Sequence, residues 1–546
     1  TVINIHNLFN KKDTLIRDQI LEYLDYSQKM TDSILLSDKN SVKLVNFLIV
    51  DTYNFNIYHS FVGFKLLTSN DNEFWNMIDD KMNNSINLMF QNEKLYTKLV
   101  SIINNHECNK KYVGFLTKIV DKFLKRGINN NKNRIKNING IIKNNEKQII
   151  RKLTTFNKIN IDKSIFENNK KGKIQVKLNR GNYFYLLNSI KDADTRSKIE
   201  KVYNSKVNTV LNDMCKIIIL RKYYAKELGY VSFFNYSNNI ITDTYNIKEL
   251  IDDLLEKASD RTFNEIKNIH SELIKDGYNK KVDRNDIIYY HRKFESDSLF
   301  KPSDVFVVLF KTINKYFGIK FVNITHEKWN ENVMTLLCID SETGKKLGIL
   351  YLDITYSDEK KIEAPLFIKL CDKFTINSKT MMSHICILGN YKDINSKCMD
   401  YNNVVLMFKE FGHVIRNLLY KSNTGLNNYN NLYDNFLPYV MEYIAWDKNI
   451  IRDIVGNKNI VGGNEEIVDH ILFSRNIDLC YSITQRCIYA LIDYTIHSSD
   501  DFTNKVNDSI KNSKTYNKTF MNLCKDLIRN KTQKFSSVLN IDNCIL

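Results

Sequence analysis

The chain has 546 residues, of which 43% are hydrophobic, and this excludes a disordered polypeptide and predicts one large domain or two to three ordinary ones. The formal net charge is +17, from 79 basic and 62 acidic residues, so an acidic partner such as nucleic acid stays open. Ten cysteines without a C-x-x-C pair argue against a disulfide framework, and no apolar run of about 18 residues is present.

Long amphipathic helices are predicted from about residue 15 to about residue 275. Only three prolines and 17 glycines interrupt the whole chain, which favours a mostly helical protein. The densest basic tract covers residues 125–152, and its isoleucines recur at roughly helical spacing. We interpret this tract as a solvated helix rather than as a nucleic-acid-binding arm.

A small β-sheet is predicted between about residues 318 and 390. The runs GIKFVNIT, MTLLCIDSETGKKLGILYLDITYS and HICILGNY are short, rich in β-branched and aromatic residues, and joined by turn residues. The stretch DSETGKK has the composition of a hairpin turn. Helices are expected again from about residue 403 onward.

The first of these helices contains LMFKEFGHVIRNLL, residues 406–419. Zinc peptidases use the pattern H-E-x-x-H, in which two histidines one helical turn apart bind the metal and the glutamate serves as general base. Here Glu410 and His413 stand at the glutamate and second histidine, but Lys409 replaces the first histidine. A small sheet followed directly by such a helix is the order of a zincin-type active site.

Further segments give the chain a resemblance to the thimet oligopeptidase, neurolysin and oligopeptidase F family of zinc metallopeptidases. GILYLDITYSDEKKIEAPLF resembles the family's strand and turn before the active site, and RNDIIYYHRKFES resembles its D-x-x-Y-Y segment. RGNYFYLLNSIKDADTRSKIEKVYNSK, LRKYYAKELGYVSFFNYS and LFSRNIDLCYSITQRCIYALIDYTIH resemble the helices on either side. The resemblance runs in the family's order over roughly residues 110–497. It implies a mainly α fold, a two-lobed ellipsoid with a deep channel and a small sheet next to the zincin-type helix.

The same resemblance assigns vestigial roles to three residues: Glu410 as general base, and His413 and Glu442 as zinc ligands. An ammonium has no lone pair to donate, so Lys409 cannot serve as the first ligand, and we expect it to pair with Glu410 or Glu442. The alternative interpretations are a core histidine for His413, a structural ion-pair partner for Glu442 and a solvated helix residue for Glu410. His384, on the preceding strand, is the one nearby histidine that could substitute as a ligand.

The family's oxyanion-stabilising segment is a second expected difference. In the family, a loop rich in glycine and tyrosine follows the helix pair that ends here near His497. Residues 498–546 contain no glycine and one tyrosine, Tyr516. We therefore expect the transition-state donors to be missing, and each such donor contributes roughly a hundred- to a thousandfold to the rate.

Our first hypothesis is an oligopeptidase-fold protein without catalytic activity or cofactor, which binds a peptide or protein partner in the channel or has a structural role. An active oligopeptidase with zinc and non-standard ligands is the alternative, and a basic nucleic-acid-associated protein is the third. We expect a helical lobe over residues 1–280 and a metallopeptidase-like core over residues 281–546. The sequence start TVINIHNLFNKKDT lacks the apolar core of a signal peptide, so a cytoplasmic protein without membrane association is expected.

Overall fold

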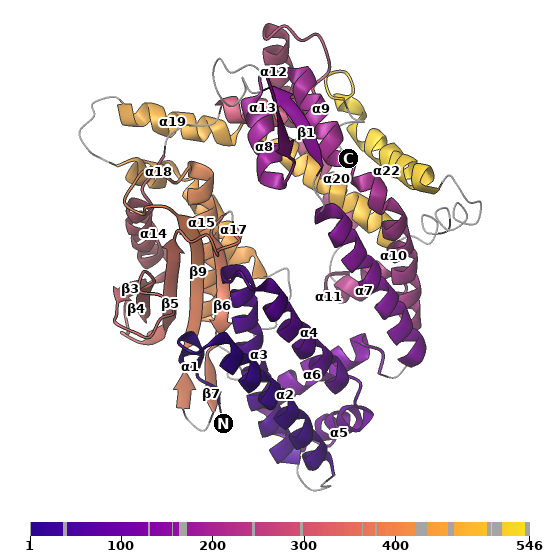
Figure 1. The fold of residues 1–546 in the computed structure, drawn as a ribbon, viewed down its shortest axis with the longest axis vertical. Coiled ribbons are helices and arrows are strands. Elements are labelled where there is room, and N and C mark those ends of the chain that lie inside the picture. The colour runs from indigo at the N-terminus through magenta and orange to yellow at the C-terminus, as the bar shows by residue number, and fades with distance from the viewer. Residues whose placement is uncertain are drawn as a thin grey trace. The chain divides into compact units, whose positions relative to one another are not determined.

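The chain folds into two compact units, each built from two separate segments (Figure 1). The computed structural model describes residues 2–36, 41–128, 132–154, 157–162, 172–242, 246–294, 299–362, 364–376, 379–420, 434–456, 463–498, 504 and 516–540. Unit 1 comprises Thr1–Ile128 and Asp297–Asp469, and unit 2 comprises Asn129–Ser296 and His470–Leu546. This division differs from the single boundary expected near residue 280, because packing between distant segments decides which of them share a core.

Unit 1 begins with a helical bundle. Its helices are α1 (His6–Phe9), α2 (Asp13–Leu35), α3 (Ser41–Thr68), α4 (Asn72–Met89), α5 (Glu93–Asn104) and α6 (Lys110–Lys125). Apolar residues at helical spacing form their buried faces, as in α4, where Trp75, Ile78 and Met82 are fully buried. The carboxylate of Asp71 caps the start of α4 by accepting a hydrogen bond from the backbone N–H of Phe74.

The second segment of unit 1 contains the sheet predicted from the sequence. Its elements are α14 (Pro302–Phe317), β3 (Ile319–Asn323), β4 (Met334–Asp340), β5 (Lys346–Thr355), β6 (Leu366–Cys371), β7 (Phe374–Ile376), β8 (Lys379–Met381), β9 (Ser383–Tyr391), α15 (Tyr401–Leu419), α17 (Phe436–Ala445) and α18 (Lys448–Val455). The five-stranded sheet has the order β3-β4-β5-β9-β6, in which only β5 and β9 are parallel. In the predicted hairpin turn, Asp340 accepts hydrogen bonds from Thr343 and Gly344 has a φ of +69°.

The two faces of the sheet are covered by different helices. Tyr351 and Cys386 lie in the core that the sheet shares with the N-terminal bundle. The opposite face packs against α15. The Ser383 hydroxyl donates a hydrogen bond to the side-chain oxygen of Asn417. The side chain of Leu418 lies so close to Gly348 that a Cβ atom at this position would overlap it. Because both faces are covered, β5 and β9 are nearly continuous apolar runs.

A buried lysine fixes the end of β5. The ammonium of Lys360, 6% exposed, lies 2.6 Å from the Asp353 carboxylate and donates to the carbonyls of Thr355 and Gly389 at 2.6 and 3.0 Å. The second oxygen of Asp353 accepts a hydrogen bond from Trp329 at 2.8 Å. Asp353 and Lys360, both within the segment GILYLDITYSDEKK, therefore fix the end of β5.

Unit 2 is mainly helical. Its elements are α7 (Lys132–Thr154), β1 (Lys158–Asp162), β2 (Lys173–Lys177), α8 (Arg180–Ser189), α9 (Ala193–Asn204), α10 (Val207–Glu227), α11 (Phe233–Thr242), α12 (Ile247–Lys275), α13 (Arg284–Phe294), α20 (Leu479–Ser498), α22 (Tyr516–Thr532) and η2 (Gln533–Phe535), and α19 (Gly463–Arg475) begins in unit 1 and ends in unit 2. The basic tract is helical from Lys132 onward and largely exposed, as expected, and one face of α7 is packed, because Ile135 and Ile142 lie against Ile217 and Tyr224 of α10. The antiparallel β1–β2 pair is a difference from the all-helical expectation for this region.

A buried ion pair joins α9 to α13 within unit 2. Arg196 and Asp286, 1% and 0% exposed, are 2.5 Å apart. The guanidinium also donates to the carbonyls of Ile190 and Lys191 and lies 4.3 Å from the centre of the Tyr289 ring. The D-x-x-Y-Y residues of RNDIIYYHRKFES thus stabilise the fold of unit 2.

We predict that Asp286→Asn lowers the free energy of unfolding of unit 2 by about 3–5 kcal/mol, because it leaves the buried Arg196 without its carboxylate. Hydrogen exchange of α9 and α13 under increasing urea would measure the change. The control is Asp253→Asn, which breaks an exposed pair with Lys257 and should change stability little. Equal protection of α9 and α13 against hydrogen exchange in the two variants would contradict the prediction.

Candidate active site

The KEFGH sequence lies on α15, as expected. The helix begins after Asp400, whose carboxylate accepts a hydrogen bond from the backbone N–H of Asn403 at 2.8 Å. A row of apolar residues, including Val404, Phe408 and Phe411, is completely buried. Lys409, Glu410 and His413 are partly buried.

Gly412 sets the distance between α15 and α17. A Cβ atom at this position would lie 2.4 Å from the Cα of Pro438 and 2.6 Å from the carbonyl oxygen of Leu437. These are backbone atoms, which a side-chain rotation cannot move. The absence of a side chain at Gly412 therefore permits the crossing that brings Glu442 to the site.

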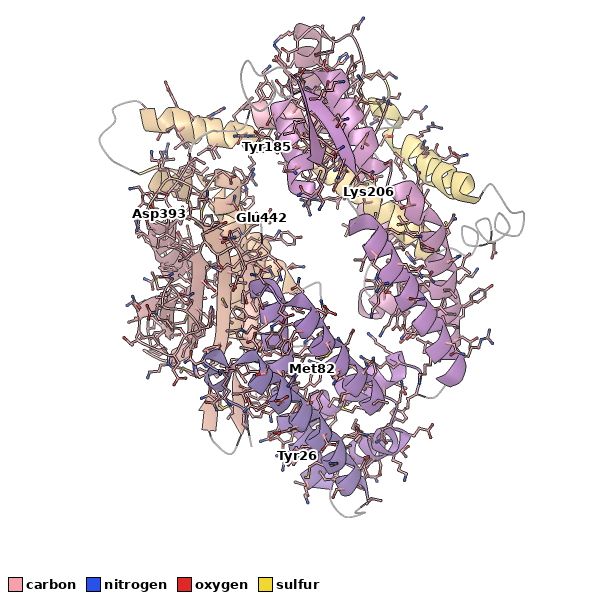
Figure 2. All side chains as sticks on the ribbon, in the orientation of Figure 1. Tyr26, Met82, Tyr185, Lys206, Asp393 and Glu442 are labelled. Atoms are coloured by element: carbon pink, nitrogen blue, oxygen red, sulfur yellow. The ribbon has the colours of Figure 1, made fainter. Side chains whose placement is uncertain are left out.

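Lys409 and Glu442 form an ion pair across the two helices. The Lys409 Nζ atom lies 2.8 Å from Glu442 Oε2 and 4.7 Å from the centre of the Tyr439 ring (Figure 2 shows the position of Glu442). The side chains are 27% and 33% exposed. The contact is close but not directional, because Oε2 accepts no hydrogen bond from the described part of the chain. Of the two carboxylates expected to pair with Lys409, the structure thus places Glu442 beside it.

Glu410 has a different partner, the backbone of strand β6. Its Oε2 atom accepts a hydrogen bond from the N–H of Phe367 at 2.7 Å. Burial raises the pKa of Glu410, and the Phe367 hydrogen bond and the charge of Lys409 oppose that shift. Strand β6 is an edge strand that pairs only with β9 among the described strands. The Glu410 carboxylate therefore accepts a hydrogen bond from a backbone N–H that points away from β9.

His413 is held as a neutral imidazole. Its ring stacks on that of Phe367, with the centres 5.5 Å apart and an angle of 26° between the planes. Burial lowers its pKa to about 4, and the positive charges of Arg416 and Lys409 contribute in the same direction. Arg416 is itself held by Asp434 at the start of the segment that leads into α17, at 2.8 Å.

These residues do not fit a catalytic zinc site. Such a site needs three protein donors. The ammonium of Lys409, which has no lone pair to donate, stands at the position of the first ligand. Its positive charge is paired with Glu442, the carboxylate expected as another ligand. Among the described residues, no group of three or more His, Cys, Asp or Glu side chains could hold a metal ion. Residues 423–431, NTGLNNYNN, an Asn-rich stretch between the KEFGH helix and Glu442, lie outside the described residues.

His384, the other candidate ligand, belongs to a separate cluster of rings. It is 7% exposed, its ring centre is 4.7 Å from that of His6, and its Nδ1 lies 3.2 Å from the hydroxyl of Tyr351. The ring of His326 packs on His6 with the centres 4.2 Å apart. Burial is the main cause that lowers the pKa of His384 to about 3, and His6 and His326 add to it.

Two site residues were not anticipated from the sequence. Phe367 contacts Glu410 through its backbone and His413 through its ring, and Tyr439 lies under the Lys409 ammonium. The glycine in KEFGH and the single proline of the α17 segment were local signals of a close helix contact. Nothing local to Phe367 indicates its role, since that depends on the pairing of β6 with β9.

The sequence profile of Peptidase family M3 matches residues 186–541, which is more than half of the chain. The chain belongs to peptidase family M3. It is 21% identical over 350 residues to a thimet-like oligopeptidase of Dictyostelium discoideum, covering 57% of this chain and 52% of that protein. It is also 21% identical over 341 residues to a probable thimet oligopeptidase of Arabidopsis thaliana, covering 58% and 48%. The chain thus spans about half the length of these M3 relatives.

Three solved peptidase structures share the fold. A putative peptidase from Chlamydophila abortus superposes with a TM-score of 0.55 at 13% identity, covering 93% of this chain and 77% of that one. A Pz peptidase A with an inhibitor gives 0.53 at 10% identity, covering 96% and 80%, and a putative oligoendopeptidase F gives 0.51 at 9% identity, covering 98% and 82%. These matches confirm the mainly helical fold, and the profile match confirms the family resemblance.

We predict that Gly412→Ala destabilises unit 1 by about 1–3 kcal/mol, because the new methyl group overlaps the backbone of Pro438. All three tryptophans, Trp75, Trp329 and Trp446, lie in unit 1, so tryptophan fluorescence under urea reports on this unit. Gly63→Ala is the matched control: this helical glycine has open space around it, and the change should leave stability equal or higher. A Gly412→Ala protein as stable as this control would refute the close contact.

We predict that His384 makes unit 1 less stable in acid. The unfolded histidine takes up a proton below a pKa of about 6.5, whereas the folded one stays neutral until about 3, so stability is lost as the pH falls through this window. Between about pH 7 and pH 5 the loss should be about 2 kcal/mol greater in the wild type than in His384→Gln, measured by tryptophan fluorescence under urea. Equal losses would mean that the folded His384 takes up a proton as readily as the unfolded one, so that its pKa is not lowered by folding.

Proposed function

We propose that this member of family M3 binds peptides, or extended segments of proteins, without hydrolysing them. The observation that carries the proposal is the Lys409–Glu442 ion pair. It puts a tethered cation where the family places a metal ion, and the positive charge compensates the carboxylate that would otherwise be left unpaired. The site can therefore be stable without zinc.

The surroundings of Glu410 support the loss of hydrolysis. A general base needs an oxygen within hydrogen-bond reach of the water from which it takes a proton. The Oε2 of Glu410 is instead engaged by the backbone N–H of Phe367 at 2.7 Å. Lys409, as an ammonium, supplies no metal ligand, and the Phe367 hydrogen bond leaves Glu410 its second oxygen as the remaining base.

Two features of the same region support peptide binding. Strand β6 forms an edge of the sheet, and its residues Leu366–Lys369 are only partly buried. Glu410 accepts the outward N–H of Phe367, so an extended peptide would pair with the outward backbone groups of β6 that Glu410 leaves open. Helix α17 presents Phe436, Tyr439 and Tyr443, which are 65%, 53% and 71% exposed. Exposed aromatic side chains on a helix that packs against α15, as α17 does, offer the large contact area that peptide recognition uses.

Binding can be tested with short, unstructured, fluorescently labelled peptides and polarisation measurements on the whole chain. Tyr443→Ala should weaken binding without altering stability, since the side chain is largely exposed. The control is Tyr26→Ala on α2, an exposed tyrosine of the same unit that lies well away from Glu442 (Figure 2). Equal losses in the two variants, or no saturable binding at all, would contradict a peptide-binding site at α17. Binding that instead falls steeply with salt and prefers oligonucleotides would favour the basic nucleic-acid-associated alternative.

We predict that the purified protein carries well under one zinc per chain after dialysis, and that Lys409→His raises this content. The variant adds an imidazole to His413 and Glu442, which makes three donors, the number of a catalytic zinc site. Elemental analysis measures the content, and the gain should disappear in the double variant Lys409→His with His413→Ala. Lys315→His, at an exposed position on α14, controls for adventitious binding to a surface histidine.

Peptide cleavage by the same preparations completes the test. Lys409→His should cleave a quenched fluorescent peptide slowly or not at all, because the Phe367 hydrogen bond holds one oxygen of Glu410 and lowers the basicity of its carboxylate. Stoichiometric zinc in the wild type would support the alternative of an active peptidase with non-standard ligands. Turnover of the variant on the order of 10 per second would show that only the ligand at position 409 was lacking.

A further inference from the structure

We propose that the N-terminal helices of unit 1 hold a binding site for a small organic anion with an apolar body, of the chemical class of a medium-chain carboxylate. The site is a cavity of about 320 Å³ lined by residues of α2, α3, α4 and α6, all within residues 24–126 (Figure 1 shows these helices). This volume is in the range of pockets that hold small molecules. The proposal does not depend on whether the site at Lys409 hydrolyses peptides.

The cavity has an apolar wall. Phe55 of α3, Ile86 and Met89 of α4 and Ile119 of α6 contribute to it, and Ile119 is only 4% exposed. Because these side chains come from three helices, they form a concave surface rather than one helix face. A hydrocarbon chain or ring inside it would leave water at about 0.8 kcal/mol per buried methylene.

The cavity also has a cation that pairs with none of the described residues. The Lys122 side chain lines the cavity and is partly buried, and its ammonium makes no hydrogen bond or ion pair with the described residues. Lys118 and Arg126 lie one turn before and one turn after it on α6, and like charges at this spacing destabilise a helix. Burial lowers the pKa of Lys122, and the charges of Arg126 and Lys118 lower it further. A bound anion would relieve this repulsion.

The acidic residues of the cavity do not supply that anion. Each oxygen of the Asp51 carboxylate already accepts a hydrogen bond at 2.9 Å, one from the hydroxyl of Tyr23 and the other from that of Ser27. Asp32 also lines the cavity but is exposed to solvent, and it forms no ion pair with Lys122 among the described residues. An exogenous carboxylate is therefore the group that matches Lys122, and Arg126 adds a second positive charge to the lining.

Titration calorimetry of the whole chain with decanoate, below its micelle concentration, tests the proposal. We expect saturable binding of one decanoate per chain. Butyrate has the same head group without the apolar body and should bind at least on the order of tenfold more weakly. Decylammonium, with the opposite charge, should show no saturable binding, since Lys122 and Arg126 would repel it.

Lys122→Gln separates the cavity from general attraction to a basic protein. Loss of a charge-assisted contact should weaken decanoate binding on the order of ten- to a hundredfold. Lys118→Gln is the matched control, because it removes the same charge one turn away on an exposed position that does not line the cavity. Tryptophan fluorescence under urea verifies that both variants retain a folded unit 1. Absence of saturable binding, equal affinities of the two variants, or equal affinities for decanoate and decylammonium would each overturn the proposal.

Discussion

The close approach of two backbones, at Gly412 on α15 and Pro438 on α17, is the constraint on which the site depends. It leaves Lys409 and Glu442 facing each other across the crossing, so that their charges meet at 2.8 Å. The other side of α15 is fixed by the sheet, where the side-chain oxygen of Asn417 accepts a hydrogen bond from the hydroxyl of Ser383. Since both sides of α15 are fixed, the scaffold sets the backbone positions of Lys409 and Glu442, and a change at position 409 alters the charge there without altering the helix crossing.

The segments that reveal the family relationship contain ionic contacts that stabilise the fold. Arg196 and Asp286 join two helices of unit 2, and Lys360 and Asp353 fix the end of a central strand in unit 1. Removing one partner from such a buried pair leaves an uncompensated charge, which is strongly destabilising. Lys409 and Glu442 are more exposed, so the candidate active site is a place where the chain could change its charges at smaller cost to stability. The buried ion pairs that identify the fold are thus different residues from Lys409 and Glu442, which determine the charges of the candidate active site.

Much of the fold could be predicted from the sequence because it depends on local patterns. Helical spacing predicted the long helices, and β-branched runs with the turn around Gly344 predicted the small sheet. The position of Lys409 followed from a motif within a single helix, whereas Glu410 and Glu442 as its candidate partners followed from the family resemblance. The β1–β2 pair and the contacts of Phe367 could not be predicted in this way, because both depend on which strands pair. Nor does a local pattern indicate that residues before 129 and after 296 share a core.

The discontinuity of unit 1 has a consequence for the newly made chain. Synthesis delivers the N-terminal helices first, but the apolar side of α3 is completed by later residues: Tyr53 stacks on Phe374, with the ring centres 4.3 Å apart, and α3 packs against β6. All of the first segment of unit 2 is made between these two parts. On the ribosome, the nascent helices must therefore keep an apolar surface from aggregating until the sheet has emerged. A chaperone that shields α3 during this interval would meet a need created by the order of the segments.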